Sequence, residues 1–178
     1  VGGLLAEGEA QVLFLATAMS LVLTPGLAAI GARVDRKLES RGLPGFTELE
    51  AATAKSESHV AIFGYGRAGQ TLARVLEASN EPYIAIDNTP ARVAAAAAAG
   101  QPVFYADAGR DKTLDMMGLD SVRLAIVAMG EAHSGADLVM ALKRRRPDLP
   151  IYARARGQEA QTLLRNAGAD VVVREVAE

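Results

Sequence analysis

A glycine pattern that follows a short apolar run places the strongest constraint on how this chain can fold. Residues 60–70 read VAIFGYGRAGQ, in which G-x-G-x-x-G separates an expected strand from an expected helix over 68–79. In such a turn Gly64 permits a sharp change of direction, Gly66 lets a phosphate approach the backbone, and Gly69 lets the helix pack close to the strand. The helix also directs free N–H groups and the positive end of its dipole at the turn. The sequence therefore predicts a phosphate-binding loop.

Short apolar runs alternate with amphipathic stretches from this loop to the end of the chain. The expected strands are 59–63, 83–86, 102–105, 122–129, 150–153 and 170–173, and the expected helices are 68–79, 90–99, 111–117, 136–146 and 158–167. Strands that alternate with helices across short loops are typical of a parallel sheet with right-handed crossovers. We therefore predict an α/β fold, a doubly wound, Rossmann-like parallel sheet.

Asp87 ends the second expected strand, 18 residues after Gly69. A carboxylate at that position accepts hydrogen bonds from the ribose hydroxyl groups of an adenosine. It favours a free 2′-hydroxyl over a 2′-phosphate, although Arg92, one helical turn further on, leaves NADP as a less favoured option. In the alternative interpretation this stretch is turn chemistry, with Thr89 as the helix N-cap and Pro90 at the first helical position.

Asp107 follows the third expected strand, and it therefore belongs to the same edge of the sheet as the glycine loop. One interpretation places its carboxylate beside the adenine or the ribose. The other makes it the cap of the expected helix over 111–117, and the sequence leaves both open. Residues 130–134 are expected to form a loop that closes the other side of the cleft.

The composition argues against several kinds of site. The chain has no Cys, which excludes disulfides and cysteine-based metal or catalytic sites, and its two histidines argue against a histidine metal site. The net charge is −2, and the basic run 143–146 is explained by its place at the end of a helix, so nucleic acid is not an expected partner. The G-x-x-x-x-G-K-S/T pattern of the P-loop is absent.

Residues 10–32 contain no charged side chain, and a helix of that length crosses a hydrocarbon core of roughly 30 Å. The basic residues that follow orient its C-terminal side towards the cytoplasm: Arg33, Arg36, Lys37 and Arg41. A signal peptide and a buried soluble helix are the rival interpretations. We predict a membrane segment over 1–34 with a transmembrane helix at about 10–32, a polar linker over 35–58 with a short helix at 49–54, and a nucleotide-binding domain over 59–178.

An ordered set of stretches resembles the KTN/RCK (TrkA-N-like) regulatory domain of potassium channels and transporters, and above all that of Kef-type potassium/proton antiporters. The matching stretches are IFGYGRAGQTLARVL (62–76), AIDNTPARV (85–93), VFYADAGRDKTLDMMGL (103–119), RPDLPIYARAR (146–156) and LLRNAGADVVVRE (163–175). The apolar run LATAMSLVLTPGLAAIG is similar to the last transmembrane helix of the same antiporters. The resemblance therefore covers most of the chain and leaves the linker unmatched.

This resemblance implies a nucleotide-binding gate that takes NAD(H) or AMP. Carried over by position, the glycines hold phosphate, Arg67 reaches it, and Asp87 takes the ribose, while Asp107 and Ala108 line the adenosine side. The full set of implied cofactor-binding residues is Gly64, Tyr65, Gly66, Arg67, Ala68, Gly69, Asp87, Asn88, Asp107 and Ala108.

The resemblance also implies a homodimer, a membrane antiporter domain as partner, and a glutathione site at the domain interface. Three arginines lie in the stretches that supply basic groups to that interface: Arg74, Arg154 and Arg156. The sequence departs from the family pattern at Gly109, where a threonine is usual, and it stops soon after Arg174 and Glu175. The later helices that complete the dimer and the glutathione pocket in the family are not in this sequence, so we expect control by glutathione to be doubtful.

The function predicted is that of a cytosolic nucleotide-sensing regulatory domain that gates a monovalent cation (potassium)/proton antiporter at the inner membrane. The chain lacks a Ser-His-Asp or Cys-His pairing and a second domain to hold a substrate, so we do not expect an enzyme. The alternatives are a truncated NAD-dependent oxidoreductase and the regulatory domain of a potassium channel.

Overall fold

The computed structural model describes Met19 and residues 42–175. Residues from Gly42 onward form one compact unit. The apolar run 10–32, predicted to cross the membrane, lies outside the described residues except for Met19. Among the helices that the structure describes, none combines the length and the apolar character that a membrane crossing requires.

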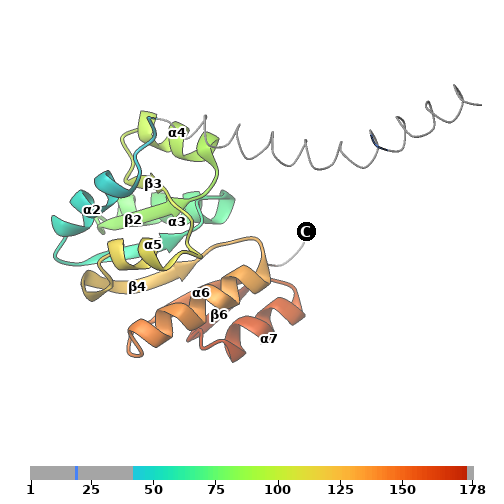
Figure 1. Cartoon of the computed structure of the whole chain (residues 1–178). Helices are drawn as coiled ribbons and strands as arrows, with labels where there is room; N and C mark the ends of the chain where they lie inside the picture. Colours follow the sequence, from blue (N-terminus) through green and yellow to red (C-terminus); the bar gives the residue numbers. More distant parts are fainter. Residues whose placement is uncertain (1–18, 20–41, 176–178) are drawn as a thin grey trace, which may run out of the picture. The chain divides into compact units, whose positions relative to one another are not determined.

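Six strands form one parallel sheet in the order β3-β2-β1-β4-β5-β6 (Figure 1). The strands are β1 (His59–Phe63), β2 (Tyr83–Asp87), β3 (Val103–Tyr105), β4 (Val122–Val127), β5 (Ile151–Arg156) and β6 (Val171–Glu175). The chain moves outward from β1 to β3 on one side and from β4 to β6 on the other, so the order reverses between β1 and β4. This arrangement confirms the predicted doubly wound sheet, and it places a topological switch point at the carboxyl ends of these two central strands.

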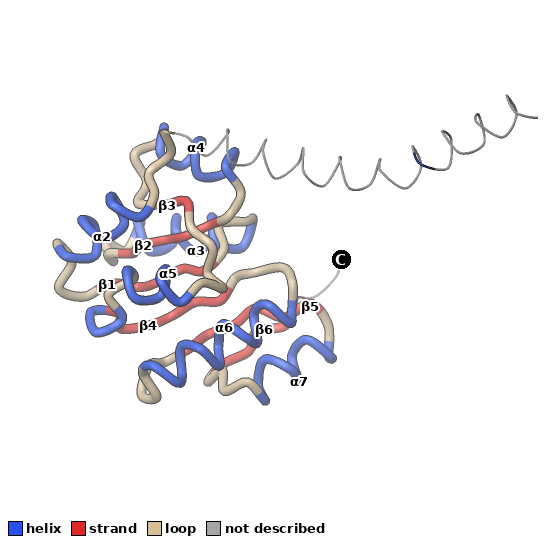
Figure 2. The backbone as a smooth tube through the Cα atoms, in the orientation of Figure 1, coloured by secondary structure: helices blue, strands red, loops and turns tan. Residues whose placement is uncertain are grey.

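Helices cover both faces of the sheet (Figure 2). They are α2 (Phe46–Ala54), α3 (Arg67–Ala78), α4 (Pro90–Ala98), α5 (Asp111–Met116), α6 (Ala132–Arg145) and α7 (Gln158–Asn166), with a 3₁₀ turn at Leu119–Ser121. Val60 and Ile62 of β1 pack with residues of α3 and α4. Ala61 and Phe63 pack on the opposite face, with residues of α2, α5, α6 and α7. Because successive side chains of a strand point to opposite faces, a strand covered on both sides reads as an unbroken apolar run.

The segment that enters the unit packs against the sheet. Helix α2 lies in the stretch predicted to be a linker, where a short helix was expected at 49–54, and its Leu49 is completely buried in the core. The backbone N–H of Gly45 donates to the Glu48 carboxylate at 3.0 Å, which ties down the first turn. The N–H of Tyr105 donates to the carbonyl of Pro44 at 2.7 Å, so the entering chain is also bonded to β3. Residues 42–58 therefore belong to the folded unit.

Besides the start of α2, two element boundaries differ from the sequence prediction by more than two residues. Helix α6 begins at Ala132, where the predicted helix began at residue 136, so the expected loop 130–134 is mostly the first turn of a helix. Strand β5 continues to Arg156, which places both Arg154 and Arg156 within the strand. Both changes bring charged side chains to the carboxyl edge of the sheet.

Candidate functional site

Two glycines of the loop are required by the fold. Gly64 has φ +101°, and a Cβ there would lie 3.2 Å from the backbone nitrogen of Met129. A Cβ on Gly69 would lie 2.1 Å from the carbonyl oxygen of Gly64, a distance that no packing adjustment accommodates. These contacts agree with the predicted roles of Gly64 in the turn and Gly69 in the close approach of helix α3.

Gly66 differs from the other two, because nothing in the fold requires a glycine there. Its φ is −73°, and a Cβ would meet no protein atom within 4 Å. It is the N-cap residue of α3 and provides no side-chain bond to the first N–H groups of that helix. The N-terminus of α3 thus reaches the pocket without a side chain in front of it, which is the geometry that binds a phosphate.

The Asp87 carboxylate lies at the carboxyl end of β2 and is held by both adjoining loops. Its Oδ2 accepts the N–H of Tyr65 at 2.6 Å, and its Oδ1 accepts the N–H of Thr89 at 2.7 Å. Nη1 of Arg92 lies 3.2 Å from Oδ2, and the Asp87 side chain is 3% exposed. Asp87 therefore organises the turn before α4, as the alternative interpretation held, and it also lies in the pocket.

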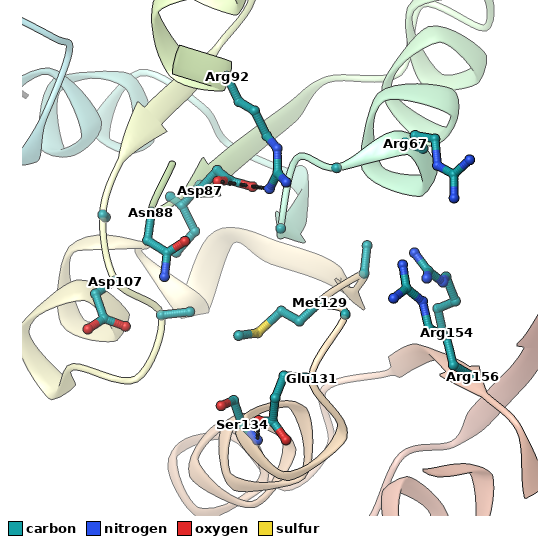
Figure 3. Close-up of a pocket in the computed structure, with 17 residues that line it drawn as sticks. Arg67, Asp87, Asn88, Arg92, Asp107, Met129, Glu131, Ser134, Arg154 and Arg156 are labelled. Atoms are coloured by element: carbon teal, nitrogen blue, oxygen red, sulfur yellow. Dashed lines mark hydrogen bonds and ion pairs between the residues drawn. The ribbon is translucent and has the colours of Figure 1, made fainter. Parts of the chain in front are cut away.

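These groups line a cavity of about 360 Å³ at the switch point of the sheet (Figure 3). The residues around it are Gly64, Gly66, Arg67, Ile86, Asp87, Asn88, Arg92, Ala106, Asp107, Ala108, Ala128, Met129, Gly130, Glu131, Ser134, Arg154 and Arg156. A volume of this size falls within the range of small-molecule sites. The lining residues come from the carboxyl ends of five neighbouring strands, β1 to β5, and from the loops and helix starts that follow them.

Positive charge gathers on one side of the cavity. Figure 3 shows Arg67, Arg154 and Arg156 across the pocket from Asp107. Glu175 at the end of β6 partly balances these cations, because it lies 2.8 Å from Nη2 of Arg154 and 3.4 Å from Nε of Arg156. This distribution of charge suits a ligand whose anionic group faces the arginines and whose polar end faces Asp107.

Most of the residues predicted for the site meet in this one cavity. Those that line it are Gly64, Gly66, Arg67, Asp87, Asn88, Asp107, Ala108, Arg154 and Arg156. Tyr65 contributes its N–H to Asp87, while its hydroxyl group donates to Gln101 at 2.8 Å. Ala68 borders a different groove, Gly69 packs against the loop, and Arg74 bonds to Thr71 on α3.

Asp107 does not cap the following helix, whose N-cap residue is Arg110. Its Oδ1 accepts the N–H of Gly109 at 3.0 Å, within its own turn. The carboxylate stays at the cavity wall, on the side expected for the adenosine.

Glu131 lies in the stretch 130–134 that was expected to close the cleft, but the sequence did not single it out as a cavity residue. Its carboxylate accepts hydrogen bonds from Ser134 and from the N–H of His133, which lower its pKa to about 2. A glutamate at an N-cap has no strong sequence signal, since shorter polar side chains are preferred there. Its carboxylate caps the N-terminus of α6, whereas the N-terminus of α3 has no side-chain cap.

Comparisons with known proteins agree with this geometry. The family model described as the TrkA-N domain matches residues 60–175. The chain is 31% identical over 176 residues to K(+) efflux antiporter 2, chloroplastic, of Arabidopsis thaliana, covering 99% of this chain and 15% of that protein. It is 30% identical over 173 residues to the glutathione-regulated potassium-efflux system protein KefC of Klebsiella pneumoniae (strain 342), covering 97% of this chain and 27% of the relative. The chain thus spans less than a third of the length of these relatives.

A solved structure gives the same result in three dimensions. The Kef C-terminal domain of Shewanella denitrificans in its AMP-bound form superposes with a TM-score of 0.59 at 28% identity, covering 66% of this chain and 71% of that one. The resemblance predicted from the ordered motifs is therefore confirmed for the region of the sheet. The chain belongs to the TrkA-N domain family, and its relatives include Kef-type potassium efflux antiporters.

Proposed function

We propose that this chain is the nucleotide-sensing regulatory part of a Kef-type potassium/proton antiporter, and that it acts by binding and not by catalysis. An adenine nucleotide, NAD(H) or AMP, occupies the cavity at the switch point. The AMP-bound Kef domain, which shares this fold, supports an adenine nucleotide as the ligand.

The open space beside Gly66 is the observation that supports the proposal most strongly. The backbone there tolerates any residue, and the space beyond it is the cavity. A phosphate placed at the N-terminus of α3 uses that space, and the ribose then extends towards Asp87 with the base between Asn88 and Asp107. In the longer NAD(H), the second half of the dinucleotide continues past Met129 towards the arginines of β5.

Gating follows from differential binding. If nucleotide binds one arrangement of paired domains more tightly than another, it shifts the population towards that arrangement. The proposed partners are a second copy of the chain and a membrane antiporter domain, with this unit on the cytoplasmic side of the inner membrane. Relatives include a chloroplastic antiporter, so the membrane itself differs among them. Glutathione is a weaker proposal, since Arg154 and Arg156 adjoin the cavity whereas Arg74 lies outside its lining.

Isothermal titration of the full chain with AMP, ADP, NADH and NAD tests the proposal. Gly66→Ala should weaken AMP binding about tenfold or more, because its Cβ takes space that the phosphate needs. The melting temperature should stay unchanged, since that Cβ meets no protein atom.

The matched control is Gly45→Ala. Gly45 has φ −120°, lies outside the cavity lining, and has room for a Cβ, so AMP affinity should persist. If none of the four nucleotides binds at millimolar concentration, the proposed function is wrong. If Gly66→Ala binds AMP as wild type does, the phosphate lies elsewhere.

A further inference from the structure

Arg92 lies in the first turn of α4 and reaches the carboxylate of Asp87 inside the cavity (Figure 3). Its Nη1 lies 3.2 Å from Oδ2 and 3.4 Å from Oδ1. The other two contacts of that carboxylate are shorter and come from backbone N–H groups, which the fold fixes. The Arg92 side chain is 47% exposed, so it is the one partner of the four contacts that can move without disturbing the loops.

The contacts leave no acceptor position on Asp87 for a ribose. A carboxylate offers about four lone-pair positions, and the two backbone bonds and the two contacts of Arg92 use them. A ribose diol therefore reaches Asp87 by displacing Arg92. The sequence showed only that Arg92 lies one helical turn beyond Asp87, whereas the structure shows its guanidinium in contact with the Asp87 carboxylate.

The charge of Asp87 is also neutralised in this arrangement. An unpaired carboxylate repels a 2′-phosphate, and that repulsion is how such a site ordinarily selects NAD over NADP. Here the guanidinium stands beside the carboxylate, and its contacts among the described residues use Nη1 alone. Nε and Nη2 remain as donors in a planar fork that suits a phosphate.

We propose that Arg92 makes this cavity accept a 2′-phosphate, so that NADPH binds with an affinity close to that of NADH. With NADH, Arg92 leaves Asp87 to the ribose diol. With NADPH, Arg92 stays in place and bridges Asp87 and the 2′-phosphate. This inference rests on the proposed nucleotide function of the same cavity.

The test is titration of the full chain with NADH, NADPH and AMP, for wild type, Arg92→Ala and Arg92→Lys. Wild-type affinities for NADH and NADPH should agree within about tenfold. Arg92→Ala should weaken NADPH binding about tenfold or more, because Asp87 then faces the phosphate without a countercharge, while NADH binding stays equal or tightens. Arg92→Lys should recover part of the NADPH affinity, since it keeps the charge but not the fork.

Arg165→Ala is the matched control, because Arg165 is an exposed arginine of α7 outside the cavity lining, and it should change neither affinity. Arg92→Ala keeps both backbone bonds to Asp87, and a thermal melt checks that this variant folds. If it does not fold, the NADH and NADPH affinities of Arg92→Lys are compared with those of wild type. Two results would overturn the role of Arg92 and leave the nucleotide function standing. In the first, wild type binds NADPH more than about a hundredfold more weakly than NADH. In the second, neither variant alters the ratio of the NADH and NADPH affinities. Binding of AMP without either dinucleotide also overturns it. Failure of all three ligands defeats both proposals.

Discussion

Asp87 serves the fold before any ligand arrives. Its two oxygens hold the glycine loop through Tyr65 and the start of α4 through Thr89. Buried N–H groups that lose an acceptor carry a large free-energy cost, so a substitution at Asp87 changes stability and ligand binding together. Gly66 and Arg92 form no bond to either loop N–H group, so substitutions there should separate ligand binding from stability better than substitutions at Asp87 do.

Asp87→Asn should lower the free energy of unfolding by about 1–3 kcal/mol in the absence of nucleotide. An amide presents one oxygen and one NH₂ group, so one of the two loop N–H groups meets a donor in place of an acceptor. Urea denaturation of the ligand-free chain measures the loss. Asp107→Asn is the comparison, because Asp107 is exposed and bonds within its own turn. Equal stability of Asp87→Asn and wild type would contradict the structural role.

His59 begins β1 and is completely buried, with neither ring nitrogen hydrogen-bonded among the described residues. Burial lowers the pKa of His59 below its ordinary value of 6.5. Because the unfolded chain binds the proton more readily, His59 costs stability as the pH falls from about 6.5 towards its folded pKa. The free energy of unfolding of wild type should therefore drop between pH 7.5 and 5.5, and part of that drop should come from His59.

His59→Leu removes the titrating group at a similar volume, and that share of the drop should disappear. His133→Gln is the control, since the His133 side chain is 82% exposed, and it should keep the wild-type drop. An identical pH dependence in His59→Leu would show that other groups cause the loss.

At the scale of elements, the sequence predicted every strand of the sheet and missed where α6 begins and where β5 ends. The strands were predictable because central parallel strands are buried on both faces and read as apolar runs. Strand β5 reads IYARAR, in which buried and more exposed residues alternate, so an apolar criterion ends it too early. Helix α6 has a glutamate as its N-cap, which is not a typical helix start signal. The stretch GEAHS was therefore predicted to be a loop, although it contains the first turn of the helix.

The Glu131 cap gives α6 a pH dependence of its own. Hydrogen bonds from Ser134 and from the N–H of His133 lower the pKa of Glu131 from 4.5 to about 2. A lowered carboxyl pKa stabilises the fold above the unfolded value, and that stabilisation is lost as the pH falls from about 4.5 to about 2. Glu131→Gln should be less stable than wild type at pH 7, and the difference should shrink at pH 3.

Urea midpoints at pH 7 and pH 3 measure this difference. Glu159→Gln is the matched control, because Glu159 is an exposed acidic residue in the first turn of α7. The urea midpoint of Glu159→Gln should differ from that of wild type by less than the midpoint of Glu131→Gln does, at both pH 7 and pH 3. A difference for Glu131→Gln that is the same at pH 7 and pH 3 would refute the cap as its source.

At the scale of the whole molecule, the motif spacing predicted the family and the edge of the sheet where the cavity lies. It could not predict how side chains meet there, because the contact of Arg92 with Asp87 depends on the side-chain conformation of Arg92 and not on spacing. Residues 42–58 were predicted to be part of a linker because their composition is polar, and composition gives no sign that Leu49 is buried. Composition reports the average over a segment, whereas one apolar face is enough to dock a helix.

Leu49→Ala should lower the free energy of unfolding by about 2–5 kcal/mol, because it leaves a cavity in the core shared by α2, α5 and the sheet. Glu50→Ala, at the exposed neighbouring position, should change it by less than about 0.5 kcal/mol. Denaturant titration of the full chain measures both. Equal, small effects would show that α2 is dispensable and that the folded unit begins at β1.

The hydrogen bond between the N–H of Tyr105 and the carbonyl of Pro44 joins the first residues of the folded unit to β3. Pro44 lies two residues after the start of the unit, and Tyr105 lies two residues before Asp107 in the cavity wall. The start of the folded unit is therefore bonded directly to β3, the strand that precedes Asp107 in the cavity wall. In the proposed gate, a force on the segment that enters the unit would act directly on β3, and a movement of β3 on nucleotide binding would be transmitted to that segment.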